Sequence, residues 1–158
     1  AKDYADCLGV TPENWSRALN GRKEVQSTVS GDEIRMPGGS LTLTQLTALL
    51  NTIPMEITFV DTENINRYFN EGPKDFKRPG MAIGREVFSC HPPKVEARVR
   101  RILQELRAGT LDEVPVWMDK NGKCMLVRYM AVRDSGGEYL GTVELVQDMG
   151  FAKEHFKG

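Results

Sequence analysis

Residues 114–148 constrain the fold more than any other part of the chain. Three runs rich in Val, Tyr, Trp and Leu lie there, at residues 114–119, 123–134 and 138–148. Two short turns separate them, Lys120-Asn121-Gly122 and Ser135-Gly136-Gly137. Asn-Gly and Gly-Gly allow the positive φ that tight hairpin turns require. The pattern predicts three consecutive antiparallel strands, and such a sheet needs a covering layer on one face.

The rest of residues 40–113 predicts two more strands and the helices of that layer. Strands are expected at residues 56–61 (EITFVD) and 65–70 (INRYFN), and residues 71–80 are expected to form a loop or short helices. Ser40 or Thr42 is a candidate N-cap for a helix whose apolar residues recur at helical spacing up to residue 53. A longer helix is expected from Pro92 or Pro93 to residue 109, with Val99 and Leu103 on its apolar face. The sequence therefore predicts an α+β domain with a five-stranded antiparallel sheet.

The first 21 residues have the spacing of two short helices joined by a turn. They resemble the helix-turn-helix of bacterial and phage repressors, in which Glu13, Asn14, Ser16 and Arg17 would face the major groove of DNA. A plain helical hairpin fits the same residues. Residues 22–40 are polar and lack periodicity, which predicts a linker. We expect a helical extension and linker at 1–38, one domain at 39–150 and a tail at 151–158.

Composition narrows the classes of function. The net charge of −1 over 158 residues gives no sign of nucleic-acid or membrane binding by the whole chain. No apolar run approaches the roughly 20 residues of a membrane span. The three cysteines are widely spaced and contain no C-x-x-C pair, which predicts free thiols in a cytoplasmic protein and no zinc site. With two histidines, no phosphate-binding glycine loop and no prominent pair of carboxylates, we expect no catalytic residues and no enzyme activity.

Residues 41–149 resemble the PAS family. The resemblance lies in the order of elements and in four motifs: ITFVD (57–61), IGREVFSCHPPK (83–94), RYMAVRD (128–134) and EYLGTVELVQD (138–148). The CHPP and RYxAVRD motifs are similar to those of a bacterial subfamily often found beside hemerythrin-like domains. The resemblance implies a sensory or regulatory module that binds a small ligand or mediates homodimerisation in signal transduction or transcription regulation. DNA binding through residues 1–21 is the alternative.

The cofactor signatures of better-known PAS members are absent, so no cofactor is assigned. Light-sensing flavin members carry a reactive cysteine just after the IGR-like turn, where this chain has Val87. Heme members carry a ligand histidine on the long helix, near Val99 here. Cys90 and His91 remain as redox or heme candidates, since a thiol at a helix N-terminus has a lowered pKa and imidazole binds metals. A buried inert cysteine and a capping histidine are the alternatives.

Strand alternation and the resemblance to flavin members together predict a ligand pocket. One face of the middle strand of the hairpins would point inward, joined by residues of the flanking strands and of the long helix. The expected lining is Trp117, Met125, Val127, Tyr129, Thr142, Glu144, Val146, Val99 and Leu103. Glu144 has an alternative, in which it faces outward and pairs with Arg128 or Arg133. The opposite face is also fairly apolar, so we expect residues 43–53 or a second subunit to cover it.

Overall fold

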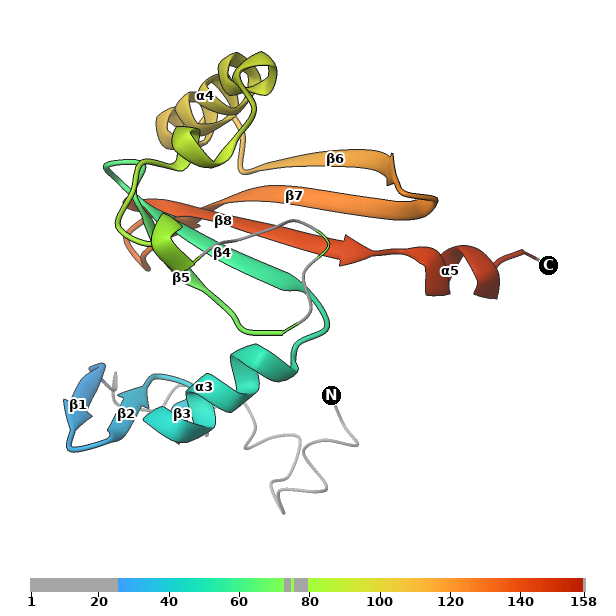
Figure 1. Ribbon diagram of the computed structural model, residues 1–158. Coiled ribbons are helices and arrows are strands. Elements are labelled where there is room, and N and C mark those ends of the chain that lie inside the picture. The colour runs from blue at the N-terminus through green and yellow to red at the C-terminus, as the bar shows by residue number, and fades with distance from the viewer. Residues whose placement is uncertain (1–25, 73–74, 76–79, 158) are drawn as a thin grey trace, which may run out of the picture. The chain divides into compact units, whose positions relative to one another are not determined.

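A five-stranded antiparallel sheet forms the centre of residues 49–158 (Figure 1). The computed structural model describes residues 26–72, 75 and 80–157, except for the side chains of Met81 and Cys90. The strands are β4 (Glu56–Asp61), β5 (Asn66–Phe69), β6 (Glu113–Lys120), β7 (Lys123–Arg133) and β8 (Tyr139–Asp148). Their order in the sheet is β5-β4-β8-β7-β6. The expected α+β fold with five antiparallel strands is confirmed.

The two predicted turns close the β6–β7 and β7–β8 hairpins. Asn121 and Gly122 have φ values of 53° and 78°, the left-handed pair that a two-residue hairpin loop requires. In the second turn, Asp134 Oδ1 accepts hydrogen bonds from the backbone N–H groups of Gly136 and Glu138, both at 2.9 Å. These turns fix the register of all three strands.

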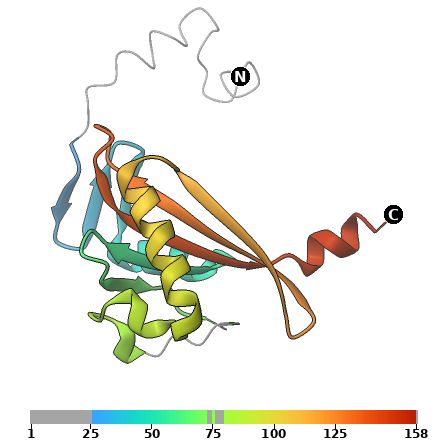
Figure 2. The ribbon, with the colours of Figure 1, turned by 90° about the horizontal axis from the view of Figure 1, so that it is seen from above.

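Helices cover one face of this sheet. They are the short 3-10 helices η1 (Gly80–Ala82) and η2 (Val87–Cys90) and the long helix α4 (Pro93–Ala108). Figure 2 shows α4 lying across the strands. Pro93 occupies the first turn of α4, and Gly109, with φ of 80°, ends it. Buried Val99, Ile102, Leu103 and Leu106 recur every three or four residues, so one stripe of α4 faces the sheet.

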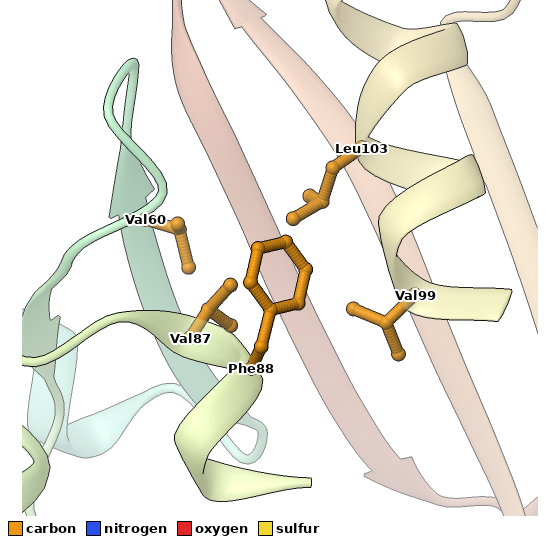
Figure 3. Packing of buried hydrophobic residues seen from close by; sticks show 5 residues of the cluster. All are labelled: Val60, Val87, Phe88, Val99 and Leu103. Carbon is orange, nitrogen blue, oxygen red and sulfur yellow. The ribbon is translucent and has the colours of Figure 1, made fainter. Parts of the chain in front are cut away.

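Two apolar clusters form the interior between the sheet and its helices. The first joins Val60 of β4, Val87 and Phe88 of η2, and Val99 and Leu103 of α4. In Figure 3 the Phe88 ring points between the side chains of the other four. Arg100 lies over that ring at 3.8 Å from its centroid, which also holds α4 against η2.

The second cluster lies on the sheet itself. It consists of Met125, Val127 and Val146, with partly buried Val116, Met118 and Tyr129 packed against them. Residues from three neighbouring strands therefore form one apolar surface.

The segment expected to be a linker contains regular structure. Strands β1 (Thr28–Ser30), β2 (Glu33–Met36) and β3 (Gly39–Thr42) form a separate antiparallel sheet, so the prediction of a linker is wrong for these residues. Strands of three or four mostly polar residues are too short to show alternation in the sequence. The predicted DNA-reading residues Glu13, Asn14, Ser16 and Arg17 lie outside the described residues.

Helix α3 (Leu43–Thr52) follows β3, and its N-cap is the predicted Thr42. The backbone N–H of Thr42 donates to Gln45 Oε1 at 2.9 Å, and that of Gln45 donates to Thr42 Oγ1 at 3.0 Å, a capping box. Contacts divide the chain into residues 1–48 and 49–158, so the division falls within this helix.

The residues expected to be a C-terminal tail begin with a helix, α5 (Gly150–His155). The carboxylate of Asp148 accepts a hydrogen bond from the backbone N–H of Gly150 at 2.8 Å, at the point where β8 gives way to α5. Phe151 and Phe156 are exposed. No helix in the described part of the chain is long and apolar enough to cross a membrane.

Candidate functional site on the inner face of the sheet

The strand register shows which residues share the helix-covered face. Directly paired residues of antiparallel strands point to the same side. Val127 lies opposite Val146, Tyr129 opposite Glu144, and Ala131 opposite Thr142. The structure thus brings all the predicted pocket residues of β7 and β8 onto one face. Val99 and Leu103 of α4 face it from the helical layer.

Trp117 does not belong to this face, and its prediction is wrong. The two-residue loop between β6 and β7 places Trp117 opposite Leu126, one position out of phase with Val127. A shift of one residue reverses the face of a strand. Trp117 is 65% exposed, and Val116 and Met118 take the inward positions on β6.

A polar row crosses the inner face between the two apolar clusters. It runs from Thr58 on β4 through Glu144 on β8 to Tyr129 on β7, each directly paired with the next. Thr58 is 3% exposed and Glu144 is 5% exposed. On one side of the row lie Val60 and Thr142, and on the other Val127 and Val146.

The alternative for Glu144, an outward carboxylate paired with arginine, is wrong. Arg128 Nε instead donates to Glu113 Oε1 at 2.6 Å, and Arg133 Nη2 donates to the carbonyl of Leu106 at 2.6 Å. Tyr129 and Glu144 both have partners within the protein. A carboxylate is therefore buried in the middle of a largely apolar interior.

A cavity of about 220 Å³ adjoins the end of this face, where β4 begins and β8 ends. Glu56, 6% exposed, lies opposite Val146 on paired strands, and both line the cavity. The remaining described lining residues come from the end of α3, the turn before β4, the segment after β5 and the end of β8. They are Asn51, Thr52, Ile53, Pro54, Met55, Glu71, Gly72, Asp75 and Asp148.

The β6–β7 hairpin holds one wall of the cavity in place. Lys120 Nζ donates to the carbonyl of Asp75 at 2.6 Å, and Lys123 Nζ lies 2.7 Å from Asp75 Oδ1. The hydrogen bond that Lys123 donates to Asp75 is the main cause that raises the pKa of the Lys123 ammonium, and the charges of Asp75, Asp148 and Glu56 raise it further. Two lysines of the β6–β7 hairpin therefore hold it against Asp75 in the segment after β5.

Glu56, Thr58 and Asp75 are functional candidates that the sequence did not predict. Alternate residues of a strand lie on the same face, so EITFVD places Glu56 and Thr58 on the face of Val60. This alternation could have predicted both polar residues at the inner face. Asp75 was not detectable, because its contacts with Lys120 and Lys123 join segments more than 40 residues apart.

His91 closes helix η2. Its backbone N–H donates to the carbonyl of Phe88 at 3.2 Å, and its Nδ1 lies 3.0 Å from the carbonyl oxygen of Val87. Because a carbonyl only accepts, Nδ1 carries the hydrogen. The side chain of Cys90 lies outside the described residues. Among the residues that are described, no group of three or more His, Cys, Asp or Glu side chains is arranged to hold a metal ion.

Comparison with known proteins agrees with this geometry. Residues 46–150 match the family model described as "PAS domain". The crystal structure of a C-terminal domain from Streptococcus mutans is 36% identical, with a TM-score of 0.71 over 84% of this chain and 98% of that one. A PAS domain from Colwellia psychrerythraea has a TM-score of 0.51 at 13% identity, covering 67% of this chain and 95% of that one.

A third similar structure is VqmA from Vibrio cholerae, solved as a complex with a ligand and DNA. It is 23% identical, with a TM-score of 0.53 over 69% of this chain and 51% of that one. At this identity the likeness concerns the fold alone. No curated protein matches the chain.

The fold and the family match define an α+β module of the PAS type. The chain belongs to the PAS family. Membership supports a sensory or regulatory role. The resemblance to the subfamily with the CHPP motif, and that of residues 1–21 to a helix-turn-helix, stay predictions.

Proposed function

We propose that residues 46–150 form a sensory module that binds a small ligand on the inner face of the sheet and controls an attached output. The observation that carries the proposal is the buried polar row Thr58–Glu144–Tyr129 between two apolar clusters. Apolar walls with a few convergent polar groups are typical of small-molecule sites.

The buried carboxylate of Glu144 distinguishes this face from a purely apolar interior. Burying a neutral polar group without a hydrogen bond costs on the order of 2–7 kcal/mol. Burying a carboxylate costs several kcal/mol unless nearby charges or hydrogen bonds offset it. Valine or leucine at Glu144 would fill the same space without that cost. Glu144 has a partner within the protein, and it also places a charged hydrogen-bonding group on the inner face that a bound molecule can contact.

The size of the adjoining cavity limits the ligand. Cavities for drug-sized molecules are roughly 300–1,000 Å³, whereas the cavity beside Glu56 measures about 220 Å³. We therefore expect a molecule smaller than a typical drug. VqmA, which has the same fold, was solved bound to DPO, and this supports a ligand-binding role for a module of this fold.

Native mass spectrometry of gently purified protein tests the proposal. We expect an added mass of a few hundred daltons or less that is lost on denaturation, and its loss in the Glu144→Gln variant. Glu138→Gln is the matched control, because Glu138 is an exposed glutamate in the turn before β8. Protein without any added mass, and without a change in melting temperature across a metabolite library, would favour a scaffold with a filled interior.

The other predicted partners and properties need separate measurements. VqmA was solved with DNA and described as a dimer, which supports testing both for this chain. Gel shifts with and without residues 1–38 test DNA binding, and light scattering tests the homodimer. An absorption band lost in His91→Ala would establish heme at Cys90-His91. We further propose a cytoplasmic protein without enzyme activity.

A further inference from the structure

We propose that the open edge of β6 pairs with the β6 edge of a second copy of this chain, so that the two main sheets continue into one. This inference assigns a surface to the homodimer and is independent of the ligand on the inner face. It follows from the length of this edge strand, from the direction of its backbone groups and from the exposed Trp117.

Strand β6 forms one margin of the main sheet (Figure 1). In the part of the chain that the structure describes, β7 is its only neighbouring strand. Proteins commonly keep edge strands short, or blunt them with proline and charge, because an unpaired edge can pair with another chain. This edge strand has eight residues. Pro115 and Asp119 flank its middle, which leaves an apolar centre at residues 116–118.

The hydrogen bonds to β7 show which backbone groups of β6 point outward. Bonded and non-bonded pairs alternate along two antiparallel strands. Just before β6, the backbone N–H of Ala131 donates to the carbonyl of Asp112 at 2.9 Å. By alternation from this bonded pair, the odd-numbered residues of β6 turn their backbone groups to the open edge. Trp117 and Asp119 therefore offer an N–H and a carbonyl there, and Pro115 offers only a carbonyl.

The Trp117 side chain supplies the apolar contact at this edge. It is 65% exposed, whereas Leu126, opposite it on β7, is 8% exposed. Tryptophan is among the residues most enriched where protein interfaces are strongest. Pairing of two β6 edges would cover the ring of each copy with that of the other.

A two-fold axis at Trp117 gives the best match between two such edges. Trp117 then lies opposite the partner's Trp117, and their backbones exchange hydrogen bonds in both directions. Val116 lies opposite the partner's Met118. Asp119 lies opposite the partner's Pro115, whose carbonyl accepts the Asp119 N–H. Aromatic and apolar pairs across neighbouring strands are stabilising.

The other registers of the same two edges are less favourable. A shift of two residues in one direction places Glu113 opposite the partner's Asp119, so like charges face each other. The opposite shift places Trp117 opposite the partner's Asp119. A shift of one residue sets outward backbone groups against residues that bond to β7. The residues of β6 therefore favour pairing with a second copy about Trp117, in which one surface patch serves both sides.

Sedimentation velocity of the full chain over a range of concentrations tests the proposal. We expect a monomer–dimer equilibrium. Trp117→Lys is expected to raise the dissociation constant at least about tenfold, because it replaces an aromatic pair by two like charges at the axis. Trp117→Phe is expected to keep the dimer. Leu140→Lys is the control, since it places the same charge on another exposed apolar residue, outside β6. A melting curve for each variant separates loss of pairing from loss of fold.

Amide hydrogen exchange tests the edge directly. The N–H of Trp117 is expected to exchange more slowly as the protein concentration rises, because pairing covers it. The N–H of Val116, which alternation directs to β7, is the internal control and is expected to be slow at every concentration.

Three outcomes would overturn the proposal. The first is a chain that stays monomeric at every concentration. The second is a dimer that Trp117→Lys leaves intact, which would move the homodimer to another surface. The third is a Trp117 N–H that is protected in the monomer, which would mean that another segment of the chain covers the edge. None of these outcomes bears on ligand binding, which the mass spectrum of the native protein tests separately.

Discussion

Asn70 determines how the chain enters the sheet. Its Nδ2 donates to the carbonyls of Leu50 and Met55, at 3.0 Å and 2.8 Å, and its Oδ1 accepts from the backbone N–H of Ile57 at 2.7 Å. Asn70 is buried just after β5, so one side chain satisfies three backbone groups between the end of α3 and β4. These groups also position one wall of the cavity.

The Asn70→Ala variant is expected to lower the free energy of unfolding by about 2–4 kcal/mol, because several backbone groups lose their hydrogen-bond partner. Urea denaturation measures the change. Asn51→Ala is the control, since Asn51 accepts a hydrogen bond from the backbone N–H of Glu71 in an exposed position. Equal losses in the two variants would contradict this role for Asn70.

The carboxylate of Asp61 makes stability depend on pH. Burial raises the pKa of Asp61, but hydrogen bonds from Arg67 Nε and from the backbone N–H groups of Ile65 and Glu63 outweigh it, so the pKa lies below the ordinary value of 3.8. A carboxyl group with a lowered pKa in the folded state stabilises the fold fully above 3.8, and this contribution disappears as the pH falls through the folded pKa.

We therefore expect Asp61→Asn to be less stable than the native chain at pH 6, with a difference that shrinks below pH 3.8. Urea denaturation at a series of pH values measures this. Glu63→Gln, in the same turn but with an exposed side chain, is expected to show little difference at any pH. A deficit of Asp61→Asn that stays constant down to the acid limit would refute the linkage.

At the scale of elements, Arg133 joins the end of α4 to the β7–β8 hairpin. Its Nη2 donates to the carbonyl of Leu106 in the last turn of α4, and its guanidinium lies 5.8 Å from the ring of Tyr139. Positive charge at a helix C-terminus is favourable, and the planar guanidinium serves both contacts.

Arg133→Lys is expected to cost about 1 kcal/mol and Arg133→Ala about 1–3 kcal/mol of unfolding free energy, because a lysine is a point charge that cannot also stack on the ring. Arg101→Ala, which removes an exposed arginine on α4 paired with Glu105, is expected to change it by less than about 1 kcal/mol. Thermal melting of the three variants gives the order of their stabilities. An order other than the expected one would be evidence against the role of Arg133 in joining α4 to the hairpin.

The sequence predicted the elements of the main sheet well because their signals are local. Turns with Asn-Gly or Gly-Gly and runs of β-branched residues define the hairpins. The proline pair and Gly109 define α4. The order β5-β4-β8-β7-β6 did not follow from such signals, and neither did the face of Trp117, because both depend on pairing between distant strands. Strands β1–β3 and helix α5 were missed because they are short and mostly polar.

The same limit applies to the candidate site. Alternation placed Tyr129 and Glu144 on one face, since it needs only the residues of one strand at a time. The cavity arises where Glu56, Asp75 and Val146 come together from three parts of the chain. The residue pattern of one strand does not predict contacts between segments that are distant in the sequence.

At the scale of the whole molecule, contacts divide the chain near residue 48, and the family match begins at residue 46. We expect a chain that lacks residues 1–38 to keep its fold, with a change in unfolding free energy below about 1 kcal/mol, because domains carry their own hydrophobic core. Urea denaturation of both lengths tests this. A much larger loss would contradict the independent folding of residues 39–158.

Strand β8 has a consequence for how the protein is made. It follows the other four strands of its sheet in the sequence, yet it lies in the middle of that sheet and pairs with β4 on one side and β7 on the other. Contacts between residues so distant in sequence slow folding, since a long loop must close before they form. We therefore expect that, during synthesis, β4 stays unpaired on its β8 side until residue 148 has emerged from the ribosome, with its apolar residues exposed in that interval.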